Sequence, residues 1–570
     1  MKYSLIVDVY EKLSGTTKKL EKTSILAKFL PKLKGNEEWS YLFRGKVFPD
    51  YNEKVFGISN QLVMKAISRA SGISEKRVVS DFKKIGDLGD VAVNLVGKKR
   101  QKTLFAKSLT VEKVFENLKK LTDMEGKGSV DRKLALVVEL LGGASGVEAR
   151  YIIRTLLQDL RVGVADGIMR DSIAEAFLDD WKENREKVEG AYDRVNDWAF
   201  IIKLAKKGVK ALNNVKVTPG RPMKVMLPVK VTDVSEAFRI CGKPLAVEHK
   251  YDGFRVIINK DDKGRVSLFT RKLDNVTNQF PDVVEIVKKH VKGKSFVIDS
   301  EVVGYDPKTK KTKPFEFISQ RIKRKHEIPR LVKKLPVEIN VFDVMFYDGK
   351  SVIDLFLRER RKLIEKIVKT EKFKIRLSKQ FISDDEKEVT KFYKDALKIG
   401  EEGIMFKKLD APYRPGRRVG YMVKMKPDAK DLDLVITGAE YGTGKRAGGL
   451  TSFYVACSDE GASFLEVGRV SSGLKEKDDA GGTTYSEMDK LLQPLIIKEN
   501  GTCVSVKPKI IVSVTYQNVQ RSPKYASGFA LRFPRITHYR PDYHLKDIAT
   551  LKDFDKEVKK EKGWRKDILG

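Results

Sequence analysis

The middle of the chain reads Glu248-His249-Lys250-Tyr251-Asp252-Gly253-Phe254-Arg255. This stretch separates two short apolar runs, Leu245–Val247 and Val256–Ile258, which predict two strands. The second run continues into the turn residues Asp261–Gly264 and returns through Val266–Phe269, the pattern of a hairpin. Lys250 therefore lies where a strand meets a loop, and such a lysine is a candidate nucleophile if nearby cations or a metal favour loss of its proton. A lysine before an Asp-Gly turn is also ordinary turn chemistry, so the stretch alone leaves both interpretations open.

The composition limits the class of protein. The chain has 570 residues, enough for about three or four domains, and 41% of them are hydrophobic, which is typical of a globular protein. The formal net charge is +35, from 113 Lys and Arg against 78 Asp and Glu. Such a surface suits a polyanionic partner such as nucleic acid. The alternative is the charged surface of a thermophilic protein or a Lys-rich proteome.

The cysteines and the apolar runs indicate the compartment. Cys241, Cys457 and Cys503 are scattered, and no Cys-x-x-Cys pair occurs, which argues against a zinc finger or a disulfide framework. No apolar run reaches the roughly 18 residues of a membrane-spanning helix, and the N-terminus lacks a signal-peptide pattern. We therefore expect a soluble, intracellular, cytoplasmic protein with no membrane partner.

The pattern of residues changes twice along the chain. Residues 1–215 predict helix after helix; for example, Trp198, Ile201 and Ala205 follow the candidate N-cap Asp197 at helical spacing. The segment Val217–Pro222, with two prolines and a glycine, ends the helical region, and short strands follow over residues 216–427. Beyond that, strands separated by glycine turns predict a small β-barrel over residues 428–570, which ends in a charged helical tail.

The strands of the middle region carry residue types that nucleotidyl transfer needs. Glu301 and Glu402 lie on separate strands and could hold Mg²⁺ through oxygen ligands. Phe342 offers a ring on which a purine could stack, although a phenylalanine in a strand is usually a core residue. Three basic side chains could neutralise a triphosphate and its leaving pyrophosphate: Arg271, Lys424 and Lys426.

A basic loop in the helical region contains a second candidate site. It reads Gln101-Lys102-Thr103-Leu104-Phe105, a polar side chain followed by an apolar pair. Exposed apolar pairs often mark a partner site, although Leu104 and Phe105 could also simply cover the core.

Taken in order, these segments resemble the nucleotidyltransferase motifs of ATP-dependent DNA ligases of the archaeal type, which are similar to the catalytic region of eukaryotic replicative ligases. The matching segments are Glu248–Arg255, Thr270-Arg271, Asp299–Glu301, Phe342-Asp343, Glu402–Lys407 and Lys424–Lys426. The family's Leu-Arg-Phe-Pro-Arg and Arg-x-Asp elements are matched by Leu531–Arg535 and Arg540–Asp542. The resemblance extends over nearly the whole chain.

The resemblance implies an enzyme that seals nicks in duplex DNA during replication, repair and recombination, with ATP and Mg²⁺ as cofactors. Lys250 would attack the α-phosphate of ATP to form lysyl-AMP; the AMP would pass to the 5′-phosphate of the nick, and the 3′-hydroxyl would displace it. The implied nucleotide-binding residues are Glu248, Arg255, Arg271, Glu301, Phe342, Arg418, Lys424 and Lys426. The implied metal ligands are Glu301 and Glu402.

The resemblance also implies a multi-domain fold and its partners. An all-α DNA-binding domain would span residues 1–215, an α+β adenylation domain with antiparallel sheets residues 216–427, and an OB-fold β-barrel residues 428–570. The expected partner is nicked double-stranded DNA, bound by a monomer associated with the nucleoid. A sliding clamp would bind the loop through Gln101, Leu104 and Phe105.

Two positions depart from the family pattern. Met422 stands where the family usually has a tryptophan, two residues before Lys424. Tyr543 stands where the Arg-x-Asp element normally continues into a lysine that orients the pyrophosphate. Either Lys546 replaces that lysine or the match shifts locally.

Other classes of protein share parts of this pattern. An RNA ligase or an mRNA-capping guanylyltransferase shares the lysine motif and a barrel but should lack the long helical region. An NAD-dependent ligase needs a four-cysteine zinc site, which three dispersed cysteines cannot form. A DNA-clamping scaffold with a decayed site is the non-enzyme alternative, and the use of ADP, GTP or NAD in place of ATP stays open.

Overall fold

The fold is described from a computed structural model. The structure describes residues 1–52, 54–97, 108–313, 315–322, 324, 326–427, 430–442, 446, 448–459, 463–476 and 483–566. Gln101, Leu104 and Phe105, the expected clamp-binding residues, lie outside the described residues. The chain forms two compact units, one of residues 1–80, 88–397 and 401–426, the other of residues 81–87, 398–400 and 427–570. Among the described helices, none combines the length and the apolar character needed to cross a membrane.

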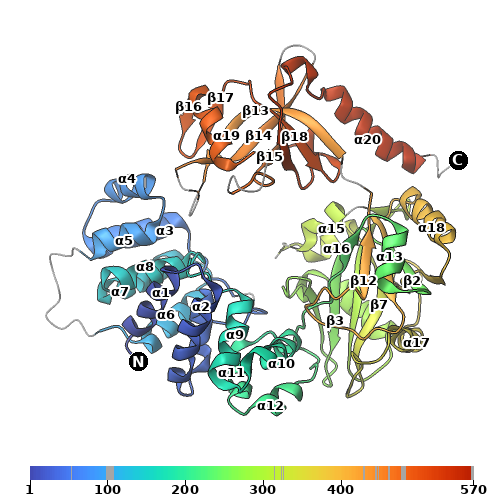
Figure 1. Ribbon diagram of the computed structural model, residues 1–570, viewed down its shortest axis with the longest axis horizontal. Helices are drawn as coiled ribbons and strands as arrows, with labels where there is room; N and C mark the ends of the chain where they lie inside the picture. The colour runs from blue at the N-terminus through green and yellow to red at the C-terminus, as the bar shows by residue number, and fades with distance from the viewer. Residues whose placement is uncertain are drawn as a thin grey trace. The chain divides into compact units, whose positions relative to one another are not determined.

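The first part of the chain is helical, as its periodicity predicts (Figure 1). Its α-helices are α1 (Ser4–Ser14), α2 (Lys19–Phe29), α3 (Asn60–Ser71), α4 (Glu75–Ile85), α5 (Leu88–Val96), α6 (Val111–Asp123), α7 (Ser129–Gly143), α8 (Gly146–Leu156), α9 (Asp166–Phe177), α10 (Trp181–Val195), α11 (Trp198–Ala205) and α12 (Val209–Asn213), with 3₁₀ turns η1 (Leu30–Leu33) and η2 (Glu37–Arg44). Asp197 caps α11 as predicted, because its carboxylate accepts from the Phe200 N–H at 3.0 Å. Trp198, Ile201 and Ala205 are buried, which confirms the predicted apolar face of this helix.

The middle of the chain forms two sheets. The first has the order β1 (Val229–Val231), β12 (Met422–Met425), β11 (Gly403–Lys408), β2 (Leu245–Lys250), β10 (Gln380–Ser383). The second has the order β4 (Val266–Thr270), β3 (Phe254–Lys260), β5 (Phe296–Tyr305), β7 (Val337–Tyr347), β8 (Lys350–Ser351), with β6 (Thr312–Lys313) beside β5 and β9 (Ile375–Leu377) beside β7. Their pairings are antiparallel except for β1 with β12 and β7 with β9. The predicted hairpin is present, because β3 pairs with β4.

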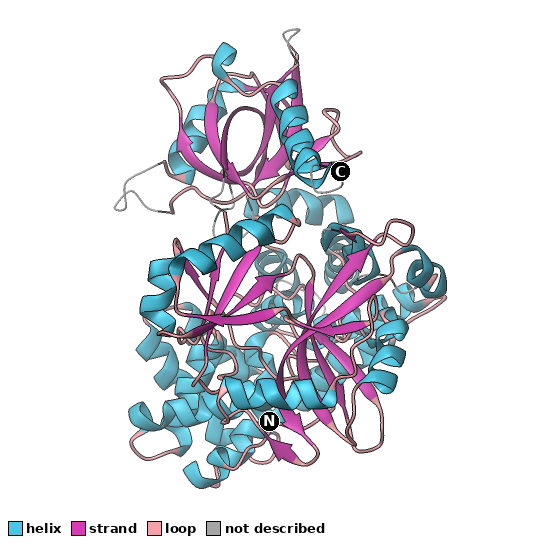
Figure 2. Cartoon of the chain, turned by 90° about the vertical axis from the view of Figure 1, so that its right-hand side faces the viewer, coloured by secondary structure: helices cyan, strands magenta, loops and turns pink. Residues whose placement is uncertain are grey.

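Helices cover the outer face of each sheet (Figure 2). Apolar side chains of α13 (Val234–Cys241) and α18 (Glu386–Lys398) pack with Val247, Ile404 and Val423 of the first sheet. Those of α14 (Pro281–His290), α15 (Phe315–Ile322) and α17 (Leu357–Ile367) pack with the second sheet, and α16 (Ile328–Lys334) follows α15 in the chain. A further apolar cluster joins the inner faces of the two sheets, with Ile257 and Val297 from one and Met422 from the other. Because side chains alternate along a strand, the residues two positions away from these apolar ones, such as Arg255, Asp299 and Lys424, are on the same inner face.

The Asp-Gly pair of the opening stretch does not close a hairpin, because β2 and β3 belong to different sheets. Gly253 instead lets the crossing chain approach β5 closely: a Cβ there would lie 2.3 Å from the carbonyl oxygen of Val302. Gly403, opposite Lys250, serves a similar purpose. Its φ is +145°, and a Cβ there would lie only 2.2 Å from the carbonyl oxygen of Met425. Both glycines are thus needed for backbone packing around Lys250.

The described residues of the last part of the chain form a β domain that also contains helices. Its long strand β13 (Lys430–Tyr441) pairs with β14 (Leu450–Ser458), β17 (Cys503–Val506) and β18 (Ile511–Tyr516). The sheet continues through β15 (Phe464–Val470), β16 (Ile496–Asn500) and β21 (Arg535–Tyr539), and β19 (Val519–Arg521) pairs with β20 (Phe529–Leu531). Phe453, Val455 and Val512 form its core with Met488 of α19 (Tyr485–Leu492) and Phe554 of α20 (Leu551–Lys566). The expected charged helical tail is α20.

Candidate active site

Lys250 is the last residue of β2 and lies beside Glu402. Gly403, which begins β11, is the register partner of Lys250, so the preceding Glu402 is brought next to the lysine side chain. Lys250 Nζ lies 2.7 Å from Glu402 Oε2, and both side chains keep some exposure, 21% and 14%. Lys426, just beyond β12, forms an ion pair with the same carboxylate oxygen. The lysine and the glutamate that the motifs predicted are therefore in direct contact.

The two lysines control the charge of Glu402. Burial alone would raise the pKa of its carboxyl, but Lys250 and Lys426 outweigh burial and hold the pKa well below the usual range. Glu402 is therefore an anion in this state and forms an ion pair with Lys250. For the Lys250 amine to act as a nucleophile it must lose its proton, which a further cation near Glu402 would favour.

Glu301 on β5 is a second carboxyl group facing the same space. Burial raises its pKa to about 8, although Lys250 and Arg255 act in the opposite direction. Within the described residues, no side-chain hydrogen bond or ion pair holds this carboxyl group; Asn340 donates only to the Glu301 backbone oxygen. A cation placed here would stabilise the ionised form, so Glu301 is suited to a metal.

The carboxylates match one kind of metal binding. The described part of the chain contains no cluster of three or more His, Cys, Asp or Glu side chains arranged for a metal ion. Glu301 and Glu402 both interact electrostatically with Lys250. Mg²⁺ is commonly bound in this way, by one or two carboxylates together with water and the phosphates of a substrate.

Basic side chains gather around Lys424. Burial lowers the pKa of Lys424, and the positive charges of Lys426, Lys250, Arg271 and Arg418 lower it further. The pKa of Arg271 is lowered as well, by burial and then by Arg255 and Arg418. Mutual repulsion of this kind means that several positive charges lie close together. Such a cluster favours an anionic ligand with several charges, such as a triphosphate.

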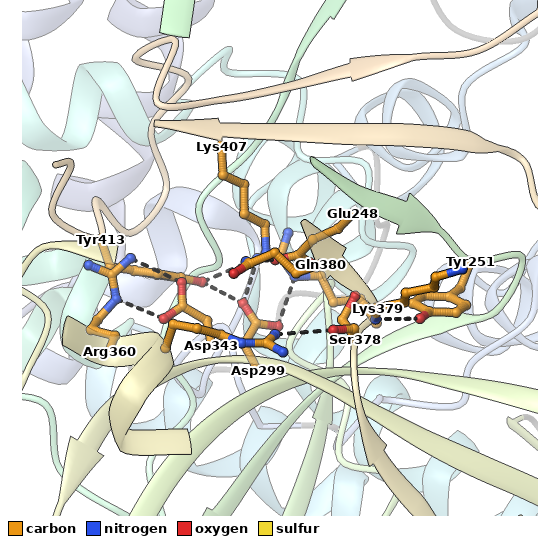
Figure 3. Close-up of polar contacts among 12 residues, drawn as sticks. Glu248, Tyr251, Asp299, Asp343, Arg360, Ser378, Lys379, Gln380, Lys407 and Tyr413 are labelled. Carbon is orange, nitrogen blue, oxygen red and sulfur yellow. Dashed lines mark hydrogen bonds and ion pairs between the residues drawn. The ribbon is translucent and has the colours of Figure 1, made fainter. Parts of the chain in front are cut away.

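A second group of predicted residues lies around the Phe342 ring. Glu248 is 2% exposed, and its two carboxylate oxygens accept from Gln380 Nε2 at 2.7 Å and from Lys407 Nζ at 2.8 Å (Figure 3). The Lys407 ammonium lies over the Phe342 ring, 4.5 Å from its centroid. The Arg255 guanidinium lies 5.4 Å from the same centroid. An aromatic ring, a carboxylate and two cations thus adjoin each other between the sheets.

Arg255 is held in place by a buried carboxylate. It donates from Nε and one terminal nitrogen to the two oxygens of Asp299, at 2.9 and 2.6 Å, and from the other to the Met226 carbonyl at 2.8 Å. The Tyr413 hydroxyl donates to Asp299 at 2.8 Å (Figure 3). Asp299 is fully buried. Two-point pairing of this kind restrains the guanidinium.

A similar pair supports the strand that carries Phe342. Arg360 of α17 donates to both oxygens of Asp343, at 2.7 and 3.1 Å, and to the backbone carbonyls of Leu355 and Ala411. Arg360 is 1% exposed and Asp343 3%. This network ties β7 to the loop that leads toward Arg418.

The structure thus brings together the predicted residues of the middle region. Four residues of the networks escaped assignment from the sequence: Gln380, Lys407, Tyr413 and Arg360. Lys407 lies within a motif segment, whereas the other three have no local pattern that marks them. Met422, at the family's tryptophan position, is a core residue between the sheets, 4% exposed.

Tyr543 belongs to the second compact unit and is described within it. Its ring lies 3.4 Å from the Arg540 guanidinium, which pairs in turn with Asp542. Tyr543 also packs against an apolar cluster that contains Ile511 and Ile548. The aromatic residue therefore supports the local structure of the Arg-x-Asp element.

Comparison with known protein families accounts for most of the chain. Residues 2–174 match the family described as DNA ligase N terminus. Residues 225–426 match the ATP dependent DNA ligase domain. Residues 446–543 match the ATP dependent DNA ligase C terminal region. The three matches follow one another in the order that the sequence predicted.

Similar proteins cover nearly the full length. A DNA ligase of Nanoarchaeum equitans is 46% identical over 556 residues, 97% of each chain. A DNA ligase of Thermococcus onnurineus is 40% identical over 572 residues, 99% of this chain and 100% of the relative. The solved structure named Pmar-Lig_PreS3 shares the fold, with a TM-score of 0.57 and 16% identity over 94% of this chain and 99% of that one. The chain therefore belongs to the ATP-dependent DNA ligase family, nucleotidyltransferases that seal nicks in DNA through an adenylate intermediate.

Proposed function

We propose that Lys250 is the residue that carries AMP in this ligase. The observation that supports this most directly is its contact with Glu402 at 2.7 Å, beside the cation cluster of Lys424. The Lys250 amine would attack the α-phosphorus of ATP, forming a P–N bond while the bond to the β-phosphate oxygen breaks. Pyrophosphate leaves with that electron pair, and the proton of the ammonium is lost.

The roles of the nucleotide-binding residues follow from their surroundings. Phe342 would stack on the adenine, with Glu248 at the edge of the base, and Arg255 and Glu301 would lie near the ribose. Arg271, Arg418, Lys424 and Lys426 would contact the phosphates, because the positive charges crowded around Lys424 match a triphosphate.

The carboxylates Glu301 and Glu402 fit a bound Mg²⁺, since Glu301 lacks a partner among the described side chains and two carboxylates suffice for this ion. Bound there, Mg²⁺ would neutralise charge that builds up on the phosphates. Its presence beside Glu402 would also weaken the hold of that carboxylate on the Lys250 proton.

The domains would divide the remaining work. The proposed boundaries are 1–215 for a DNA-binding domain, 216–427 for the adenylation domain and 428–570 for an OB-fold. The end of α12 at Asn213 and the start of β1 at Val229 support the first of these boundaries. The net charge of +35 favours binding of nicked duplex DNA.

Three further expectations belong to this proposal. The enzyme would act as a monomer, because one chain contains all the predicted site residues. It would work inside the cell at the nucleoid, where its DNA substrate lies. A sliding clamp would bind the loop that contains Gln101, Leu104 and Phe105.

The test is covalent labelling. The protein is incubated with Mg²⁺ and ATP, GTP or NAD labelled in the α- or adenylyl phosphate. We expect ATP to leave label on the denatured protein that mild acid releases, as a P–N bond predicts. Lys250→Ala should abolish it, whereas Lys230→Ala, an exposed lysine in the same sheet, should not. Undiminished label in Lys250→Ala would overturn the assignment, and labelling by GTP alone would indicate a capping enzyme. Sealing of nicked DNA, but not nicked RNA, completes the test.

A further inference from the structure

Gln380 is the cross-strand neighbour of Glu248 in the sheet that carries Lys250. The two residues are register partners on β10 and β2, and Gln380 Nε2 donates to Glu248 Oε1 at 2.7 Å. From the opposite side, Lys407 of β11 donates to Oε2 at 2.8 Å. One nearly buried carboxylate is therefore held by donors from both flanking strands (Figure 3).

These contacts decide what Glu248 can bind. Lys407 is itself only 4% exposed, so each charge of this ion pair compensates the other in a place where water is largely excluded. An ionised carboxylate only accepts hydrogen bonds, and each of its oxygens can accept more than one. A ligand group that meets Glu248 must therefore be a donor.

The carboxylate lies next to the expected place of the base. Lys407, which binds Glu248, also lies 4.5 Å from the centroid of the Phe342 ring. A purine stacked on that ring would direct one edge toward Glu248. Adenine presents an exocyclic amine, a donor, on its six-membered ring, whereas guanine presents a carbonyl oxygen at the same position, an acceptor.

We propose that Gln380 is a positioning residue for nucleobase discrimination: it holds the Glu248 carboxylate in the orientation that accepts a hydrogen bond from the adenine amine. The proposal rests on the proposed stacking of the base on Phe342. Without Gln380, Lys407 alone binds the carboxylate and draws it toward β11, away from the amine. Gln380 itself need not touch the nucleotide.

The variant Gln380→Met tests this, because methionine keeps a similar length and removes the donor. The matched control is Ile382→Met on the same strand, where the side chain is 56% exposed. Rates of covalent labelling of Lys250 are measured with ATP, with GTP and with purine riboside triphosphate, which lacks the amine. Thermal melting of each variant is recorded alongside.

We expect the wild-type protein to prefer ATP over purine riboside triphosphate by about tenfold or more, as a hydrogen bond to a charged acceptor predicts. Gln380→Met should reduce this preference at least about fivefold, mostly through a higher KM for ATP, while Ile382→Met leaves it unchanged. Gln380→Glu, whose new carboxylate repels Glu248, should also reduce the preference for ATP. This variant replaces Gln380→Met in the test if the methionine variant does not fold.

Two results would overturn the proposal. One is an unchanged preference in the Gln380 variants, even if labelling falls equally with all nucleotides, because a purely structural role has that effect. The other is a wild-type protein that labels equally well with ATP and purine riboside triphosphate, because there would then be no amine recognition to position. Failure of the proposed function looks different: the wild-type protein would then take no label from any nucleotide.

Discussion

Acid should weaken the sheet around Lys250 through His249. This side chain is 8% exposed, and its ring packs against that of Phe392 on α18, with centroids 4.7 Å apart. Burial, together with the positive charges of Lys379 and Arg376, lowers the pKa of His249 from 6.5 to about 4. In the unfolded chain the imidazole recovers its ordinary pKa.

The sign and size of the effect follow from this difference. Between pH 6.5 and 4 the unfolded state binds a proton that the folded state does not, so stability is complete above pH 6.5 and falls as the pH falls. At pH 5 the loss corresponds to 1.5 pH units, or about 2 kcal/mol at about 1.4 kcal/mol per unit. His249→Gln should not show this loss, since glutamine does not titrate.

The loss of stability is measured by hydrogen exchange with mass spectrometry. Exchange rates of peptides from β2 and α18 are compared at pH 7 and pH 5 after correction for the intrinsic exchange rate. We expect the opening free energy of the wild-type protein to fall by about 2 kcal/mol more than that of His249→Gln. The control is His544→Gln, because His544 is 79% exposed on its side chain and should behave like the wild-type protein. An equal fall in wild type and His249→Gln would refute the reasoning.

Three further predictions concern the site. Gly403→Ala should lower the melting temperature and abolish Lys250 labelling, because the new Cβ would lie 2.2 Å from the Met425 carbonyl oxygen; near-normal melting and labelling would contradict this. Arg360→Met should lower the free energy of unfolding in urea by about 3–5 kcal/mol, because it leaves Asp343 buried without its partner. The control Arg358→Met, at an exposed arginine, should change this free energy little, and similar losses in both variants would contradict the prediction. Removal of Mg²⁺ with a chelator should abolish labelling by ATP, and label formed without divalent metal would argue against the proposed metal role.

Local patterns accounted for much of the fold. The period of apolar residues predicted the helices before Asn213, and Asp197 was predicted as the cap of α11. The alternation in the middle region predicted strands, and the turn at Asp261–Gly264 predicted the β3–β4 hairpin. These features succeed because a helix turn, a cap or a tight hairpin is formed by residues that are neighbours in the chain.

The same local logic was insufficient at the Asp-Gly pair. Its residues suit a hairpin, yet the chain crosses there from one sheet to another, and Gly253 is needed because the crossing passes close to Val302. Which strand pairs with which depends on burial over the whole domain, and two residues cannot carry that information.

By itself, the sequence predicted the chemistry: residue type and order marked Lys250, Glu301, Glu402 and the cations as candidate site residues. Only the tertiary structure decided how these groups are held. Gln380 lies 132 residues from Glu248 in sequence, and the two meet because β10 and β2 pair in one register. Chemical reactivity belongs to the side chain, whereas position, burial and charge balance arise from contacts between segments that only folding brings together.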